Sequence, residues 1–423
     1  RLIVLDANVL FAASVALAGS TVLVAPAASA TNPLPEEAFG MHVPTVSQGT
    51  TPGVTLGSIR LWDSGVAWGQ VQQRKNRFWW NGMNDAIARS NEQGAEILYV
   101  LGSTPRWAAK NKKQGTYPNR GAASMPKRAA WKRWVRTVTQ RYGDSIGAYQ
   151  IWNEANLKDF WRGSPKQMAI LTADAYRIIK RYDPTATVVA ASSTVRLEKA
   201  YKRFFPKYLK QLRKRGWPID AVAIHTYPDG RGTPADRVRY INQTRVDMRR
   251  ANVPARIQLW DTEVNYGIPG PGKIKGREIT GGQAADWVAQ TYLENLMLGV
   301  DRAYWYYWAP ANNRIGITMQ DGTPGAIGFQ AVSSWLSGAF YSCGEQGELN
   351  ICNLGDNINP EAVVWSTDSA GTYTVPAGVA WQCNSLNQCN PVAPGSVITI
   401  GSSPQWFGTQ AAYDGNQAFF ARQ

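Results

Sequence analysis

Short apolar runs alternate with longer amphipathic segments between about residues 39 and 335. Eight runs have the length and composition of buried strands, and they lie at residues 39–43, 58–62, 96–101, 148–152, 187–191, 221–225, 256–260 and 302–308. Helical periodicity falls between most of them. In 165–182 it follows Ser164, Pro165 and Gln167, which together form a typical helix start. Eight strands alternating with helices over about 270 residues predict an α/β fold, the (β/α)8 or TIM barrel.

The pattern changes after residue 335, where helical periodicity ends. Short β-type runs follow at 362–365, 372–375 and 396–400, separated by clusters of Gly, Pro, Asn and Ser, which predicts a small β-sandwich. The charge changes at the same place. Residues 1–330 carry 44 basic and 24 acidic side chains, whereas the remainder carries one basic and six acidic side chains. We therefore predict a barrel domain over 31–335 and a β-rich accessory domain over 336–423.

The first 30 residues have the pattern of a secretion signal. The run 9–24 is rich in Ala, Val and Leu, and Ala28-Ser29-Ala30 fits a small-residue cleavage site. This run is too short and too rich in alanine to predict a membrane span. We therefore expect a secreted protein with no membrane attachment beyond this segment.

All four cysteines lie in the predicted accessory domain. Their close spacings favour Cys343–Cys352 and Cys383–Cys389 disulfides in an exported protein, although four cysteines allow three pairings. The sequence has no CxxC motif, and its two histidines lie far from the cysteines. We therefore expect neither a metal nor an organic cofactor.

Two of the eight predicted strands end in a glutamate. The run 148–152 leads into Asn153-Glu154, and the run 256–260 leads into Asp261-Thr262-Glu263. A carboxylate at the end of a buried strand is costly unless it is paired or has a function. In a closed barrel the carboxyl ends of the strands carry the chemistry, so the fourth and seventh strands should bring these glutamates together. Two facing carboxylates are the groups that hydrolyse a glycosidic bond.

The neighbours of these glutamates raise a question of direction. Consecutive strand residues point to opposite faces, so Asn153 and Glu154 can both face a cleft only where the strand ends or bulges. An amide at Asn153 can bind a sugar hydroxyl. Asp261 has the same parity as Glu263, and we expect it to point inward below Glu263 as support.

The Trp-Asn-Glu strand end, the later Thr-Glu strand end, the eight βα units and the aromatic eighth strand resemble glycoside hydrolase clan A, nearest to families 39 and 5 in secreted form. The resemblance covers residues 39 to about 335. It implies a retaining mechanism with Glu154 as general acid/base and Glu263 as nucleophile. Glu154 must begin protonated, so we expect burial and the proximity of Glu263 to raise its pKa.

The same resemblance assigns further residues to the sugar-binding site. Asn153 would bind the sugar 2-hydroxyl next to the reacting carbon, and His225 would line the same subsite. Tyr227 would donate to the nucleophile and Arg60 would support it. Trp308 would be the platform under the reacting sugar.

Two loops rich in Lys and Arg, 110–126 and 264–280, follow the third and seventh predicted strands. They favour an anionic polysaccharide as substrate, although solvated surface loops account for them equally well. An alternative is a non-catalytic carbohydrate-binding or cell-wall-associated protein, against which the intact pair of carboxylates argues. The positive charge also raises nucleic-acid binding, but the sequence has no such motif and we expect none. We expect a monomer.

Overall fold

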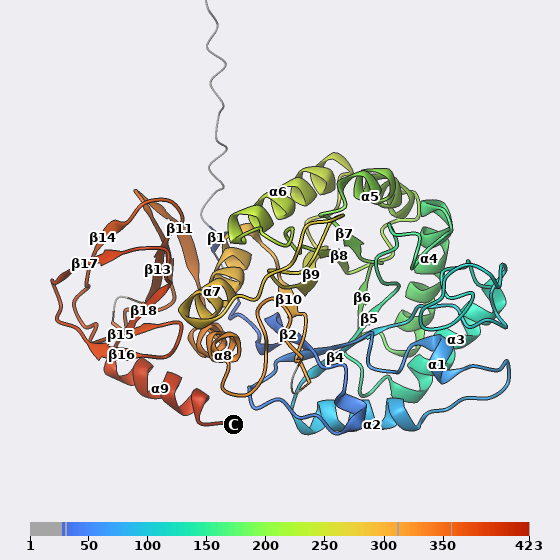
Figure 1. Cartoon of the computed structure of the whole chain (residues 1–423), viewed down its shortest axis with the longest axis horizontal. Helices are drawn as coiled ribbons and strands as arrows, with labels where there is room; N and C mark the ends of the chain where they lie inside the picture. The colour runs from blue at the N-terminus through green and yellow to red at the C-terminus, as the bar shows by residue number, and fades with distance from the viewer. Residues whose placement is uncertain (1–27, 30–31, 311–312, 357, 423) are drawn as a thin grey trace, which may run out of the picture.

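The computed structural model describes residues 28–29, 32–310, 313–356 and 358–422. The predicted leader over 1–30 therefore lies outside the described residues, apart from Ala28 and Ser29. A barrel and an accessory β region lie side by side along the long axis of the molecule (Figure 1). No helix of the described residues is long and apolar enough to cross a membrane.

The eight predicted strands form a closed parallel barrel, as the sequence predicts. They are β2 (Phe39–His42), β3 (Ser58–Leu61), β4 (Glu96–Val100), β5 (Ala148–Gln150), β6 (Thr187–Val189), β8 (Ala221–His225), β9 (Gln258–Val264) and β10 (Arg302–Trp305). Strands that follow one another in the chain are neighbours in the barrel. The pairing of β10 with β2 closes the ring. A short strand, β7 (Ser193–Thr194), adds to β8.

Helices surround the barrel (Figure 1). They are α1 (Trp68–Val71), α2 (Asn81–Glu92), α3 (Arg128–Tyr142), α4 (Pro165–Tyr182), α5 (Glu198–Arg213), α6 (Pro234–Arg250), α7 (Gly281–Leu298) and α8 (Pro324–Leu336), with 3-10 turns η1 (Glu36–Ala38) and η2 (Val46–Gln48). The predicted start of α4 is confirmed. Ser164 Oγ accepts from the Gln167 amide at 3.2 Å, and Gln167 Oε1 accepts from the Ser164 amide at 2.8 Å.

The barrel interior is a packed core below the site. Trp260 and Tyr304 fill it, and small side chains such as Ala148 and Ala221 face them. Gly40 is required here, because a side-chain carbon at this position would lie 2.4 Å from the Tyr304 ring. The filled interior gives the polar residues at the strand ends a rigid floor.

The accessory region is built from two antiparallel sheets. The larger sheet contains β1 (Ala28–Ser29), β11 (Ser342–Gln346), β12 (Leu349–Asn353), β13 (Ala362–Ser366), β15 (Trp381–Asn384), β16 (Cys389–Pro391) and β18 (Gln405–Gly408). The smaller sheet pairs β14 (Gly371–Thr374) with β17 (Val397–Ile400). An apolar core that includes Val364, Ile400 and Phe407 lies between them. The favoured disulfides, Cys343–Cys352 and Cys383–Cys389, are both present.

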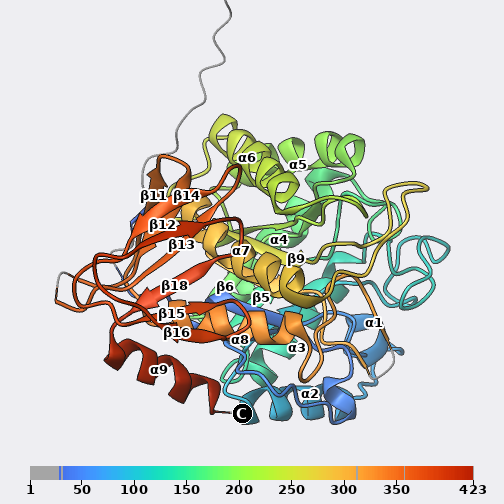
Figure 2. The ribbon, with the colours of Figure 1, turned by 60° about the vertical axis from the view of Figure 1, so that its left-hand side comes forward.

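The accessory region packs against the helices α7 and α8 (Figures 1 and 2). Ser385 and Ser403 both donate to the carboxylate of Asp286 on α7. A helix that the sequence pattern did not indicate, α9 (Gln410–Phe420), contacts α8. The domain boundary at 335–336 stays a prediction, and it falls at the end of α8.

Candidate active site

A bulge in β9 decides which of its acids faces the site. Ile224 of β8 pairs with Asp261, but the next residue, His225, pairs with Glu263, so Thr262 is the extra residue. The bulge breaks the alternation of side chains. The expectation that Asp261 points inward below Glu263 is wrong, because Asp261 instead binds Arg237 of α6, with Nη2 and Oδ2 2.9 Å apart.

The second glutamate stands beyond the end of β5. The strand ends at Gln150, four residues before Glu154, which frees Asn153 and Glu154 from strict alternation. Glu154 has a φ of +39°, a left-handed conformation that is uncommon for a residue other than glycine. Its amide donates to Ser192 Oγ at 2.9 Å. This backbone geometry turns the Glu154 side chain toward the barrel mouth.

Arg60 of β3 ties the strand ends together. Its Nη1 donates to Glu263 Oε1 at 2.7 Å, its Nη2 donates to Asn153 Oδ1 at 2.8 Å, and its Nε donates to Gln150 Oε1 at 2.8 Å. Arg60 is buried, with an exposed fraction of 1%. Asn153 is thereby oriented through its oxygen, and no acceptor among the described residues takes its amide hydrogens.

Tyr227 binds the other oxygen of the same carboxylate. The phenol, in the loop after β8, donates to Glu263 Oε2 at 2.7 Å. Together with Arg60, it fixes both oxygens of Glu263. The contact between Tyr227 and Glu263 that the resemblance implies is therefore present, as is the contact between Arg60 and Glu263.

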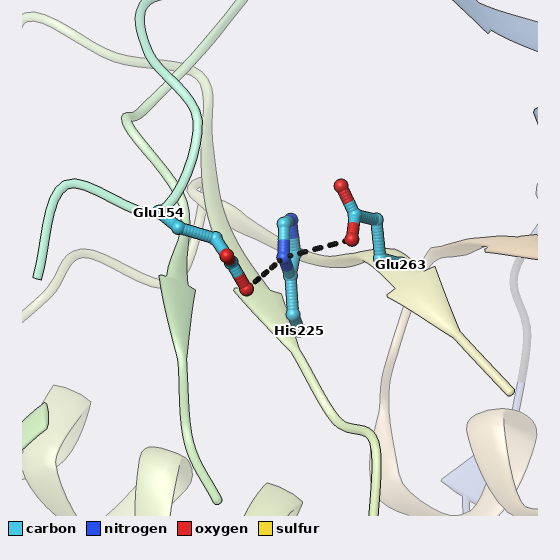
Figure 3. A group of neighbouring side chains, drawn as sticks. All are labelled: Glu154, His225 and Glu263. Carbon is cyan, nitrogen blue, oxygen red and sulfur yellow. Dashed lines mark hydrogen bonds and ion pairs between the residues drawn. The ribbon is translucent and has the colours of Figure 1, made fainter. Parts of the chain in front are cut away.

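His225 lies between the two glutamates (Figure 3). Its Nδ1 is 3.0 Å from Glu154 Oε1 and 3.4 Å from Glu263 Oε2, and its Nε2 is 3.1 Å from Thr262 Oγ1. One carboxylate oxygen of each glutamate and a nitrogen of His225 all lie within 4.8 Å of one another. From the sequence we expected His225 to line the sugar subsite, but not to contact both Glu154 and Glu263.

The titration of these groups follows from their burial. Burial raises the pKa of Glu154 to about 7, although the positive charges of Arg196 and Arg60 oppose this rise. Burial therefore accounts for the direction that the sequence led us to expect. Burial also lowers the pKa of His225 to about 3. His225 is therefore neutral near pH 7 and offers one N–H, which fits donation from Nδ1 toward the carboxylates.

A cavity of about 380 Å³ lies at the ends of β3 and β10, and none of the residues described above lines it. Its aromatic lining consists of Trp62, Tyr117, Phe160 and Tyr306. Tyr306 connects the cavity to the carboxylates, because its ring meets that of Tyr227 edge-on at a centroid distance of 6.0 Å. The sequence marked the aromatic end of the eighth strand but did not single out Tyr306. Flat aromatic faces beside a polar site suit a sugar ring.

Trp308, the expected platform, lies just beyond β10. Its amide donates to the His42 carbonyl at 2.8 Å, and the residue is 4% exposed. Trp308 does not line the 380 Å³ cavity. The role of Trp308 as a platform stays a prediction. The Tyr306 side chain is more exposed than that of Trp308.

Glu154, His225 and Glu263 are also close enough to hold a metal ion. Their other contacts do not favour one. Both oxygens of Glu263 are already bound, by Arg60 at 2.7 Å and by Tyr227 at 2.7 Å. A cation here would compete with a buried guanidinium. The arrangement suits acid–base and nucleophilic chemistry better than metal binding.

Comparison with known proteins gives likeness in structure but not in sequence. No family model matches the sequence, and no curated protein matches it. A family 39 β-xylosidase from Caulobacter crescentus is similar in structure, with a TM-score of 0.63, 15% identity, and coverage of 91% of this chain and 98% of that chain.

Two further solved structures are similar. A family 39 glycoside hydrolase from Bacteroides cellulosilyticus WH2 has a TM-score of 0.62 and 17% identity, and the match covers 90% of this chain and 81% of that chain. A family 30 endoxylanase from Clostridium papyrosolvens C71 has a TM-score of 0.59 and 12% identity, with coverage of 90% and 97%. At these identities the comparisons establish the fold alone, a TIM barrel with an accessory β region.

Proposed function

We propose that this protein is a retaining glycoside hydrolase that cleaves O-glycosidic bonds in an oligosaccharide or polysaccharide. The observation that carries the proposal is the approach of Glu154 and Glu263, whose nearest oxygens lie within 4.8 Å at the ends of the fourth and seventh barrel strands. Retaining enzymes hold their two carboxyl groups about 5–5.5 Å apart, whereas inverting enzymes need about 6.5–9.5 Å for a water between them. The short spacing supports retention.

In the first step the Glu263 carboxylate attacks the anomeric carbon and forms a glycosyl-enzyme ester. Glu154 gives its proton to the departing oxygen as the glycosidic bond breaks. A pKa of about 7 keeps Glu154 protonated in mildly acidic solution. In the second step Glu154 removes a proton from water, which attacks the same carbon and releases Glu263.

The surrounding residues act by position. Arg60 and Tyr227 hold Glu263 in place through bonds to its two oxygens. His225, neutral and buried, orients Glu154 through Nδ1. The free amide hydrogens of Asn153 would donate to a hydroxyl next to the reacting carbon, and the aromatic cavity would hold a neighbouring sugar.

We also propose that the protein is exported and monomeric. Two disulfides form in the accessory region, and such bonds persist in oxidising surroundings. The leader-like sequence over residues 1–30 also supports export. One of the similar β-xylosidase structures is described as monomeric. The substrate would be a glycan, with the basic loops favouring an anionic one.

Hydrolysis of a polysaccharide panel tests the proposal. Wild-type protein should release reducing sugar from at least one polymer, and Glu154→Gln should abolish most of that release. Proton NMR of the first product should show the same anomeric configuration as the substrate. Binding without release would favour the non-catalytic alternative, and an inverted product would exclude the covalent mechanism.

A further inference from the structure

Arg196 is a cation at the barrel mouth with an unusual environment. It follows β7 and precedes α5, and its side chain is half-buried. Its Nη1 lies 3.4 Å from the carbonyl oxygens of Pro228 and Ile268, which belong to the loops after β8 and β9. Its guanidinium carbon lies 5.4 Å from the centre of the Tyr227 ring. The loops after β8 and β9 therefore hold this cation in one place.

Two buried arginines of the barrel, Arg60 and Arg237, are paired with carboxylates. Arg60 binds Glu263, and Arg237 binds Asp261. In the part of the chain that the structure describes, no carboxylate oxygen lies within 4.0 Å of an Arg196 nitrogen. A guanidinium held in a partly desolvated place without a counter-ion is costly, and its planar donors match the oxygens of a carboxylate or sulfate. Arg196 is thus prepared for an anion from outside the chain.

The loops that hold Arg196 carry more positive charge. The Gly230 amide donates to the Gly270 carbonyl at 3.0 Å and so joins the two loops. A cavity of about 470 Å³ beside this junction is lined by Asp229, Arg231, Lys273, Ile274 and Lys275. The loop after β9 projects on the same side of the molecule as the basic loop after β4 (Figure 2). An anionic chain would therefore meet positive charge on its way to Arg196.

We propose that Arg196 is a specificity-determining residue that pairs with a carboxylate or sulfate on a sugar next to the scissile bond. This inference rests on the proposed function and refines its substrate class to anionic glycans. The position beside the Tyr227 ring, whose hydroxyl binds Glu263, is what places the anion close to the scissile bond. A second consequence concerns the acid itself: the charge of Arg196 lowers the pKa of Glu154 against the effect of burial.

Matched polymers test the inference. Glucuronoxylan and alginate serve as uronate probes and κ-carrageenan as a sulfate probe, each beside its carboxyl-reduced or desulfated form. Wild-type protein should cleave the anionic member of one pair at least about tenfold more efficiently than the neutral member. Arg196→Met should lower kcat/KM for the anionic member by about 10- to 100-fold, the range of a charge-assisted hydrogen bond, and change the neutral member less than about threefold.

Two further variants separate recognition from structure. Arg196→Lys keeps the charge but loses the planar donors, so its loss should be intermediate. Arg203→Met serves as the matched control, because Arg203 is an exposed arginine on the adjoining helix α5 that bonds only within that helix. In Arg196→Met the alkaline limb of the pH–rate profile should also move to higher pH, which a purely structural role would not cause.

Each other outcome overturns the inference in a recognisable way. Equal losses on the anionic and neutral members would make Arg196 a support for Tyr227 alone. If the wild-type protein preferred neutral polymers, an anionic substrate would be ruled out, while the hydrolase proposal would stand. If no polymer is cleaved in a manner that depends on Glu154, the proposed function fails and this inference fails with it.

Discussion

Strand β9 supplies one carboxylate to each of two buried arginines, and the two pairs have different surroundings. Glu263 meets Arg60 at the barrel mouth, with 2.7 Å between Oε1 and Nη1. Asp261 meets Arg237 between the barrel and the helices, with 2.9 Å between Oδ2 and Nη2. The bulge at Thr262 sends these two acids to opposite sides of one strand.

The Arg237–Asp261 pair lies outside the barrel and is fully buried, so we call it the closed pair. Arg237 also donates to Thr226, to the Thr291 carbonyl and to Asn295, and both Arg237 and Asp261 have an exposed fraction of 0%. The Arg60–Glu263 pair at the barrel mouth has neighbours that can still bind a ligand, so we call it the open pair. The Asn153 amide beside it has free hydrogens, and the Glu154 side chain is 14% exposed. A buried ion pair therefore does not mark a site by itself. Unused bonding capacity next to a cavity does.

The largest expected effect tests the open pair. Glu263→Gln should lower kcat by about 10³-fold or more, because it removes the proposed nucleophile. Asp261→Asn, on the same strand, should keep kcat within about tenfold of wild type, since its side chain faces the helices. Steady-state assays on the preferred substrate decide this. Comparable losses in the two variants would erase the distinction between the pairs.

The next effect concerns the closed pair. Arg237→Met leaves Asp261 buried without a counter-charge and should reduce the free energy of unfolding by about 3–5 kcal/mol. Urea denaturation followed by fluorescence measures this change. Arg239→Met, in the same helix but with a side chain 70% exposed, is the control and should change stability by less than about 0.5 kcal/mol. Equal stability of the two variants would contradict the structural role of Arg237.

The pH dependence distinguishes the two glutamates at the barrel mouth. Glu154, the proposed general acid, can donate a proton only when it is protonated, and burial raises its pKa to about 7. On the alkaline side, kcat/KM should therefore fall about tenfold for each pH unit above about 7. Rates measured across this range in wild type and Glu154→Gln test the assignment. An alkaline limb that persists in Glu154→Gln would belong to another group.

The smallest effect compares two buried phenols. Tyr227→Phe removes the 2.7 Å hydrogen bond to Glu263 and should lower kcat/KM by about tenfold. Tyr266→Phe removes a 2.7 Å contact with Thr291 on the helix side and should leave kcat/KM nearly unchanged. Both variants need thermal melts to confirm folding. A loss of kcat/KM in Tyr266→Phe but not in Tyr227→Phe would contradict the assignment of Tyr227 to the site.

Much of the barrel could be predicted from sequence, because its strands are apolar runs of strand length separated by amphipathic helices. The positions of Glu154 and Glu263 followed from the strand order, since parallel strands in a barrel share one end. The contacts of Arg60 and Tyr227 with Glu263 came from the resemblance and not from periodicity. The roles of these residues stay predictions.

The errors and omissions have a common cause, which is pairing between distant segments. The bulge at Thr262 depends on how β8 and β9 align, and nothing local in the sequence reveals it. Tyr306 and Arg196 could not be singled out from the sequence, because both contact Tyr227, which is distant from them in the chain. Only two residues of helix α9, Asn416 and Phe419, are buried, and the helix depends on contact with α8, so the sequence pattern alone did not indicate it.

The two disulfides have a consequence for producing the protein. Each joins neighbouring strands over a short stretch, with sequence separations of 9 and 6 residues, and neither reaches the barrel. The barrel strands and their helices contain no cysteine. A reducing expression host should therefore yield a correctly folded barrel whose accessory hairpins have lost their cross-links. The proposed hydrolysis would then survive, whereas the resistance of the accessory region to proteases would be lost.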